Sequence, residues 1–317
     1  MASSASPVVV KAGYSFFGPD LNRQEAEIPS ELFTHLYAGF AVVDKDGQLN
    51  IPEPYSELFG GFSKTVQVRN PRVKTLLSIG GEGADLSAVV ANRDSRAHLI
   101  TDSIDLAKKF GFDGLDLCWL YPSKANQKEP LASLLIEWRS ALDLDFKKTK
   151  KPANNLLLTA AVFHHPGIPG TDGKITFDYP TQALSDNLDW INVQAIDFYT
   201  PSNSSERTGP VHAWKTRPMD MQNRCGIKSA RPATNKLTPM AYRDIQEELR
   251  RGTYETVYDK EYYAVYSHKI NGEGWICYDD GLCIFEKVSK AIDDKLGGYF
   301  AWRVGADDVN WTLSRSN

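Results

Sequence analysis

The candidate chemistry of this chain is concentrated in the run 111–122, which reads Gly-Phe-Asp-Gly-Leu-Asp-Leu-Cys-Trp-Leu-Tyr-Pro. It contains two carboxyl side chains, Asp113 and Asp116, and a positioned carboxyl group can serve as a general acid or base. Toward its end the run has Cys118 and Leu120. Because leucine has no proton to donate, we do not expect acid catalysis from that position.

Other residues that often bind metals or phosphates do not form a site pattern here. The four cysteines show neither a C-x-x-C nor a Cys/His spacing, so we expect no zinc site and no cofactor. His164 and His165 are adjacent, and adjacent residues of a strand point to opposite faces, so a shared ion is not expected. Cys277 and Cys283 are spaced to close a small loop, and free or partly buried thiols are the alternative.

Apolar runs alternate with amphipathic stretches along the chain. Runs rich in Val, Leu and Ile and bounded by Gly, Pro or Asp predict buried strands at 8–14, 35–42, 73–79, 114–119, 156–162, 190–195 and 298–302. Helical spacing of apolar residues predicts helices at 95–110, 131–147, 242–251 and 284–296. This alternation predicts a parallel sheet, either doubly wound or closed as a barrel. A nucleotide-binding doubly wound fold is disfavoured, because Gly80-Gly81 lacks the context of a phosphate loop.

One segment near the end has a different character. Runs rich in Tyr, Val and Thr at 253–258, 262–266 and 275–278, with an Asn-Gly pair at 271–272, predict a small antiparallel insertion. The sequence shows no linker, low-complexity tract or repeat. We therefore expect a single domain over residues 7–317 that contains an insertion at 238–280.

The amino-acid composition argues against some classes of binding partner. The 317 residues are 42% hydrophobic and 24% charged, with a formal net charge of −4 and a sequence pI near 5.9. Because the net charge is negative and no run of Lys or Arg stands out, nucleic acid and acidic membrane surfaces are not expected as partners. No segment is long and apolar enough to predict a membrane span.

The run 111–122 resembles the signature of the family 18 glycoside hydrolases, G-F-D-G-x-D-x-D-W-E-Y-P, and in particular that of plant class V chitinases. Three other segments agree in order: 74–81 resembles the third-strand S-x-G-G motif, 188–199 the sixth-strand segment, and 297–308 the eighth strand and its loop. The resemblance implies an α/β fold, a (β/α)8 TIM barrel with a small α+β insertion before the last helix and strand. It places the ligand site at the carboxyl ends of the strands.

The sequence departs from the family pattern at three positions of the catalytic machinery. Family members use a glutamic acid to protonate the leaving oxygen, while the N-acetyl group of the substrate attacks the anomeric carbon. Leu120 stands in the place of that acid, Cys118 in the place of the neighbouring aspartate, and Ile196 in the place of a tyrosine that holds the N-acetyl group. Asp113 and Asp116 are retained. We therefore expect a pseudoenzyme of chitinase ancestry, with no catalytic residues.

The resemblance also indicates residues that could still bind a sugar. Trp302 matches the eighth-strand tryptophan on which the family stacks its central sugar, an arrangement that needs no chemistry. The other expected ligand-binding residues are Tyr14, Phe40, Gly81, Gln194 and Asp197. For the aromatic residues, packing in the barrel core is the alternative, and Gln194 and Asp197 could instead satisfy one another.

A family barrel has its seventh strand after an Asn-Lys-Leu triplet. Here Asn235-Lys236-Leu237 is followed at once by a stretch that resembles the interior of the insertion, and 209–239 contains no strand-like run. We expect a missing or degenerate seventh strand, which would expose unpaired strand edges. Such a gap weakens the case for sugar binding and favours a degenerate copy.

Three hypotheses follow. The first is a catalytically inactive, lectin-like protein that binds chitin oligosaccharides or related glycans. The second is a protein-interaction or enzyme-inhibitor module that uses surface loops of the same scaffold. The third is a residual glycoside hydrolase in which Asp113, Asp116 or Asp197 replaces the acid. The resemblance implies an extracellular or vacuolar protein, but the chain as written begins without a signal peptide, which leaves the cytoplasm open.

Overall fold

The computed structural model describes residues 9–18, 27–149, 155–170, 174–198, 207–208, 210–214, 227–228, 240–271 and 274–316. Contacts divide the chain into two compact units. One contains Val10–Gln194 and Phe300–Gly305, and we call it the barrel unit. The other contains Met1–Val9, Ala195–Tyr299 and Ala306–Asn317, and we call it the insertion unit.

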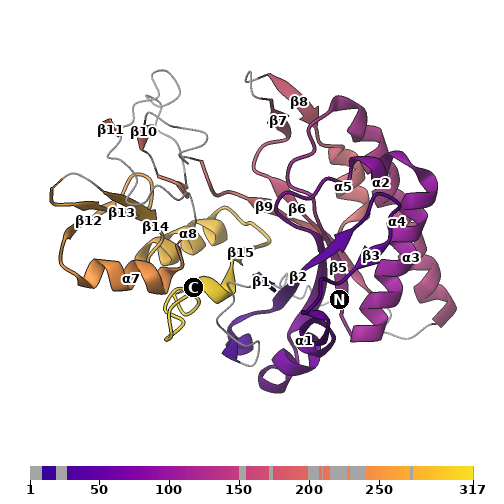
Figure 1. The fold of residues 1–317 in the computed structure, drawn as a ribbon, viewed down its shortest axis with the longest axis horizontal. Helices are drawn as coiled ribbons and strands as arrows, with labels where there is room; N and C mark the ends of the chain where they lie inside the picture. The colour runs from indigo at the N-terminus through magenta and orange to yellow at the C-terminus, as the bar shows by residue number, and fades with distance from the viewer. Residues whose placement is uncertain are drawn as a thin grey trace, which may run out of the picture. The chain divides into compact units, whose positions relative to one another are not determined.

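The barrel unit is built on a parallel sheet. Its strands are β1 (Val10–Phe16), β2 (His35–Val43), β4 (Lys74–Gly80), β5 (Gly114–Cys118), β6 (Leu157–Phe163) and β9 (Trp190–Gln194), each paired in parallel with the next. The strand β15 (Gly298–Trp302) lies beside β1, and the short β3 (Leu49–Asn50) is antiparallel to β2. The strands form a nearly closed barrel, and Figure 1 shows the helices grouped outside them. The predicted TIM-type fold is therefore confirmed.

Helices connect successive strands of the barrel unit. They are α1 (Ser56–Arg69), α2 (Ser87–Ala91), α3 (Arg93–Phe110), α4 (Lys128–Thr149) and α5 (Thr181–Asn187), with short 3-10 turns at Ser30–Leu32, Ala125–Gln127 and Val304–Ala306. Local sequence sets the limits of α3: the Asn92 side chain accepts from the N–H groups of Asp94 and Ser95, and Gly111 ends the helix at φ +74°. All five residues of β5 are buried, as expected for a strand covered on both faces.

The hairpin of β7 (Gly167–Pro169) and β8 (Ile175–Asp178) follows β6 and was not expected from the sequence. Its strands are short, and one of them contains a proline, so the segment lacks the apolar run that predicts a strand. The predicted long strands and helices were found within a few residues of their expected limits. None of the helices in the described ranges is both long and apolar enough to cross a membrane.

The insertion unit contains a three-stranded antiparallel sheet of β12 (Tyr254–Asp259), β13 (Ala264–Lys269) and β14 (Trp275–Tyr278). Two helices, α7 (Tyr242–Arg250) and α8 (Gly281–Asp293), belong to the same unit. Its core joins one face of the sheet to these helices through Ile245, Val265, Ile276, Tyr278 and Cys283. The antiparallel strands predicted here were found, and the domain limits at 7–317 and 238–280 stay predictions.

The predicted absence of a seventh strand falls largely on residues outside those described. Within 209–239 the described residues are 210–214 and 227–228, and the latter form β11 (Ile227–Lys228), which pairs antiparallel with β10 (Arg207–Thr208) in a separate two-stranded sheet. In the described part of this stretch no strand joins the barrel sheet.

Candidate functional site

Leu120 lies inside an apolar cluster at the carboxyl end of β5. Its side chain is only 2% exposed, and Cys118, two residues earlier, is fully buried. The cluster joins inward-facing residues of several strands, namely Ala12, Tyr14, Tyr37, Leu76, Cys118, Leu120 and Ala161. The position that the resemblance assigns to a catalytic acid is thus filled by hydrocarbon and closed to water.

Cys118 is a free thiol of low reactivity. Burial raises its pKa well above the ordinary value, and the nearby Asp116 carboxylate acts in the same direction. Because the thiolate is the reactive form, this cysteine is not a nucleophile at neutral pH.

Asp116, two residues before Cys118, is the centre of a polar network. Its side chain is fully buried and accepts three hydrogen bonds from hydroxyl groups: Ser78 at 2.6 Å, Thr159 at 2.7 Å and Tyr14 at 3.0 Å. Burial raises the pKa of Asp116 from 3.8 to about 6, although these three hydrogen bonds lower it. All three donors are occupied in holding this carboxyl group in place.

Tyr14 belongs to the same network and has no exposed surface. Its hydroxyl donates to Asp116 and accepts from the Asn192 side-chain amide at 2.8 Å, and its ring stacks on Tyr37 with centroids 4.3 Å apart. Trp190 in turn donates to the Tyr37 hydroxyl at 3.1 Å. Tyr14 therefore has a structural role in this structure, and its contact with a ligand stays a prediction.

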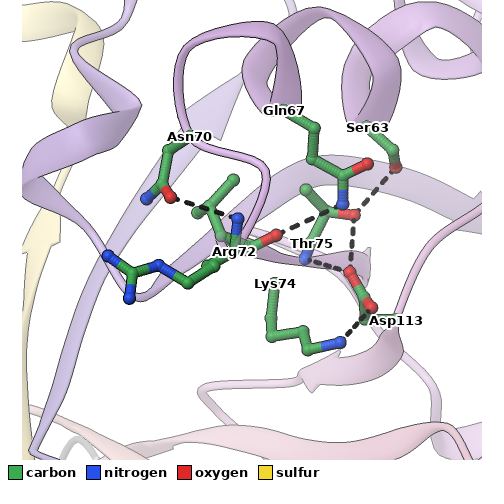
Figure 2. Close-up of polar contacts among 8 residues, drawn as sticks. Ser63, Gln67, Asn70, Arg72, Lys74, Thr75 and Asp113 are labelled. Carbon is green, nitrogen blue, oxygen red and sulfur yellow. Dashed lines mark hydrogen bonds and ion pairs between the residues drawn. The ribbon is translucent and has the colours of Figure 1, made fainter.

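Asp113 lies at the opposite end of β5, before the first residue of the strand. Figure 2 shows its carboxylate between the Lys74 ammonium, at 2.7 Å, and the backbone N–H of Thr75, at 2.9 Å. The Thr75 hydroxyl, which also contacts Ser63, is 3.5 Å away. These contacts fix the amino-terminal ends of β4 and β5, where barrel residues contribute to stability.

An aromatic group surrounds Trp302 at the end of β15. The centroid of its ring system is 4.7 Å from that of Phe16, 4.8 Å from Tyr14 and 6.0 Å from Phe40. Phe16 was not predicted as part of the site, although it stands two residues after Tyr14 and therefore on the same face of β1. Trp302 itself is only partly buried.

Gly81 adjoins this aromatic group. Its backbone has φ +100°, and a Cβ atom added there would come within 2.6 Å of the Phe40 ring. Its N–H donates to the carbonyl oxygen of Cys118 at 2.9 Å. Glycine at this position lets the β4 loop approach both the Phe40 ring and the end of β5.

Two further side chains hold the segments that follow the strands. The Tyr179 hydroxyl accepts from the N–H of Phe163 at 3.1 Å and donates to the carbonyl oxygen of Leu120 at 3.3 Å. The Gln127 side-chain oxygen accepts from the N–H groups of Ser123 and Lys124, both at 2.8 Å. Sequence patterns did not indicate these residues: Tyr179 acts through the backbone of remote segments, and Gln127 through the backbone of its own turn.

The remaining predicted site residues come from the sixth-strand segment. Gln194 ends β9 and is only 6% exposed. Ile196 and Asp197 belong to the insertion unit, where Ile196 is partly buried and Asp197 is exposed with φ +62°. The structure thus brings together Tyr14, Phe40, Cys118, Leu120 and Trp302, with Gly81 against Phe40.

The described cysteines do not form a disulfide. Cys118, Cys277 and Cys283 are free, and Cys225 lies outside the described residues. Burial raises the pKa of Cys277 to about 11 and that of Cys283 to about 12, so both are thiols at neutral pH. In the described part of the chain, no group of three or more His, Cys, Asp or Glu side chains is arranged to hold a metal ion.

Comparison with known proteins gives the ancestry of this site. The model of the family "Glycosyl hydrolases family 18" matches residues 14–219. The class V chitinase of Arabidopsis thaliana is 36% identical over 352 aligned residues, which cover 99% of this chain and 90% of the chitinase.

Solved structures agree. A class V chitinase from Nicotiana tobaccum in complex with NAG4 has a TM-score of 0.86 at 33% identity, with 97% of each chain covered. A chitinase-like agglutinin from Robinia pseudoacacia has a TM-score of 0.79 at 30% identity, over 97% of this chain and 98% of the agglutinin. This chain therefore belongs to the family 18 glycosyl hydrolases, with plant class V chitinases among its relatives.

Proposed function

We propose that this chain is a catalytically inactive member of its family that binds oligosaccharides containing N-acetylglucosamine. The observation that carries the proposal is the burial of Leu120, at 2% exposure, among the apolar residues at the end of β5. A proton donor at this place is the first requirement of the family reaction. General acid catalysis is typically worth about 10²–10⁴-fold in rate, and leucine supplies none of it.

Neither retained aspartate of the barrel unit is placed to substitute for that acid. Asp113 precedes β5 and stands seven residues before Leu120, which corresponds to about 23 Å of extended chain at roughly 3.3 Å per residue. Asp116 is four residues away along the strand and fully enclosed by its three hydroxyl partners. These positions argue against a residual hydrolase that uses either carboxyl group.

The aromatic group around Trp302 supports the binding half of the proposal. An aromatic ring at the mouth of a barrel offers a surface against which the apolar face of a sugar can stack. Trp302 is partly exposed, and its ring system packs against the rings of Tyr14 and Phe16. A related class V chitinase was solved with NAG4, and a related chain is a chitinase-like agglutinin, so both the ligand and the lectin role occur among proteins of this fold.

Calorimetric titration of the purified chain with chitin tetraose tests the proposal, together with an assay for release of shorter oligomers. We expect heat of binding, no turnover above buffer, and loss of the heat in Trp302→Ala. Trp275→Ala, which removes a partly buried tryptophan of the insertion unit, is the matched control and should bind as the parent does. Hydrolysis, or equal binding by Trp302→Ala, would contradict the proposal.

A second candidate function, a protein-interaction or enzyme-inhibitor module, is favoured by the surface of α8. Along and just beyond this helix, apolar residues at successive spacings of three, seven and four are 48–62% exposed: Leu282, Phe285, Ile292 and Leu296. Exposed apolar patches of this kind often mark protein interfaces. Inhibition of an active class V chitinase by the chain, abolished by Phe285→Glu, would favour this function over glycan binding.

A further inference from the structure

The Gln194 side chain lies on the inner face of its strand, and its hydrogen-bonding capacity is not fully used by the described residues. Along β9, Ile191 and Val193 are each 42% exposed, whereas Asn192 is 4% and Gln194 6% exposed. Side chains of a strand alternate between its faces, and Asn192 donates to the Tyr14 hydroxyl inside the barrel. Gln194, two residues later, therefore lies on the inner face at the carboxyl end of the strand.

The side-chain oxygen of Gln194 is buried and accepts no hydrogen bond from the described residues. Buried polar atoms are nearly always hydrogen-bonded, because an unpaired acceptor loses its contacts with water and gains nothing in exchange. Gln127 offers a direct comparison within the same unit: it is 5% exposed, and its amide oxygen accepts two backbone N–H groups. The same amide in two equally buried places is thus satisfied in one and unsatisfied in the other.

Strand register places this acceptor at the same end of the sheet as Leu120. Asn192 pairs with Ala161, and Ala161 pairs with Cys118 on its other side. Two residues farther along, Gln194 pairs with Phe163, while Leu120 follows Cys118 by two residues, just beyond the end of β5. The acceptor therefore stands at the end of the sheet where the resemblance places catalysis, and its partner in the strand register, Phe163, is apolar.

A single acceptor beside an apolar side chain suits a ligand group that combines one hydrogen-bond donor with a hydrocarbon part. The acetamido group of an N-acetylated sugar contains both parts, an N–H donor and a methyl group on the same side of its amide, together with a carbonyl oxygen. A 2-hydroxyl group lacks the methyl, and a free amine is charged and costly to bring out of water.

We propose that Gln194 is a specificity-determining residue whose side-chain oxygen accepts the acetamido N–H of a bound N-acetylhexosamine. This inference rests on the proposed glycan binding and adds the group that is recognised. It assigns selectivity for the N-acetyl group to a residue outside the positions now occupied by Cys118, Leu120 and Ile196. Sites that hydrogen-bond a ligand discriminate strongly against analogues that lack the partner group.

The test uses the full chain and two matched variants, Gln194→Met and Gln127→Met. Methionine keeps the length of glutamine and removes its acceptor. Each protein is titrated with chitin tetraose and with cellotetraose, and each is melted without ligand. We expect Gln194→Met to bind chitin tetraose about tenfold more weakly, to lose its preference over cellotetraose, and to melt no lower than the parent. Gln127→Met should melt lower and keep its preference.

The possible results separate the two proposals. Tight binding of chitin tetraose by the parent and by Gln194→Met alike would overturn the inference and leave the glycan-binding function standing. A fall in the melting temperature of Gln194→Met as large as that of Gln127→Met would show that the oxygen already has an internal partner, which also overturns it. No binding by the well-folded parent would remove the proposed function, and the inference with it.

Discussion

Replacing Asp116 with asparagine tests whether the buried polar network stabilises or strains the barrel. The carboxyl group is fully buried and surrounded by three hydroxyl donors, and burial still dominates, raising its pKa from 3.8 to about 6. Asparagine has nearly the same shape but does not titrate. The two proteins should therefore differ in how their stability depends on pH, whatever constant offset the substitution introduces.

The sign and size of the effect follow from the pKa shift. A carboxyl group whose pKa is higher in the folded state binds its proton more tightly there than in the unfolded chain. Its stabilising contribution is complete below about pH 4 and is lost as the pH rises through about 6. A shift of about two units at 1.36 kcal/mol per unit corresponds to about 3 kcal/mol. The advantage of Asp116→Asn over the parent should grow by about this amount between pH 4 and pH 7.

Denaturant unfolding of both proteins at several pH values between 3.5 and 7.5 measures this difference. Subtracting one curve from the other removes the contribution of all other titrating groups. Ser78→Ala, which removes the donor at 2.6 Å, should raise the pKa of Asp116 further and steepen the dependence. If the difference in unfolding free energy between the two proteins does not change with pH, the reasoning is refuted. The hydroxyl groups would then compensate fully for the effect of burial on the pKa of Asp116. If the advantage of Asp116→Asn shrinks as the pH rises, the hydroxyl groups lower the pKa of Asp116 by more than burial raises it.

Three other substitutions have defined outcomes. Leu120→Glu should leave hydrolysis of a fluorogenic chitin oligomer at background, since Cys118 and Ile196 remain, and should destabilise the chain by roughly 2–4 kcal/mol in a melting experiment because a carboxyl group enters an apolar cluster. Gly81→Ala should cost roughly 1–3 kcal/mol by denaturant unfolding, because alanine is strained at φ +100° and its methyl group meets the Phe40 ring; retention of full stability would disprove the close approach. Asp113→Asn should lower stability by about 1 kcal/mol and leave the heat of chitin tetraose binding unchanged, since its contacts lie at the amino-terminal ends of the strands; weakened binding would contradict this placement.

The sequence predicted the framework of the barrel unit better than the details of its site. Buried strands such as β5 were recognisable because both faces are covered and nearly every residue is apolar. The replacement of the acid by Leu120 was also evident, since it depends on residue type within a continuous motif. In these cases the information is local, and neighbouring residues in the chain carry it.

Features that depend on contacts between remote segments were not predicted. Tyr179 joins the ends of β5 and β6 through backbone atoms, and such a contact leaves no trace in the residue pattern around it. The complete burial of Tyr14 arises from its stacking on Tyr37 and from Asn192, which is 178 residues away in the chain. The unsatisfied oxygen of Gln194 is likewise a property of the packed interior, because only the surrounding fold determines which partners an amide meets.

The hydrogen-bond network around Asp116 also favours one alignment of the strands during folding. Its partners Tyr14, Ser78 and Thr159 come from β1, β4 and β6, separated from Asp116 by 102, 38 and 43 residues, and Asn192 adds β9 through Tyr14. A slip of one residue in any of these strands would turn its polar side chain to the outer face and leave a hydrogen bond unmade. A chain without the family's acid thus has a reason to keep this aspartate: it selects a single alignment of five strands that apolar contacts alone specify less strictly.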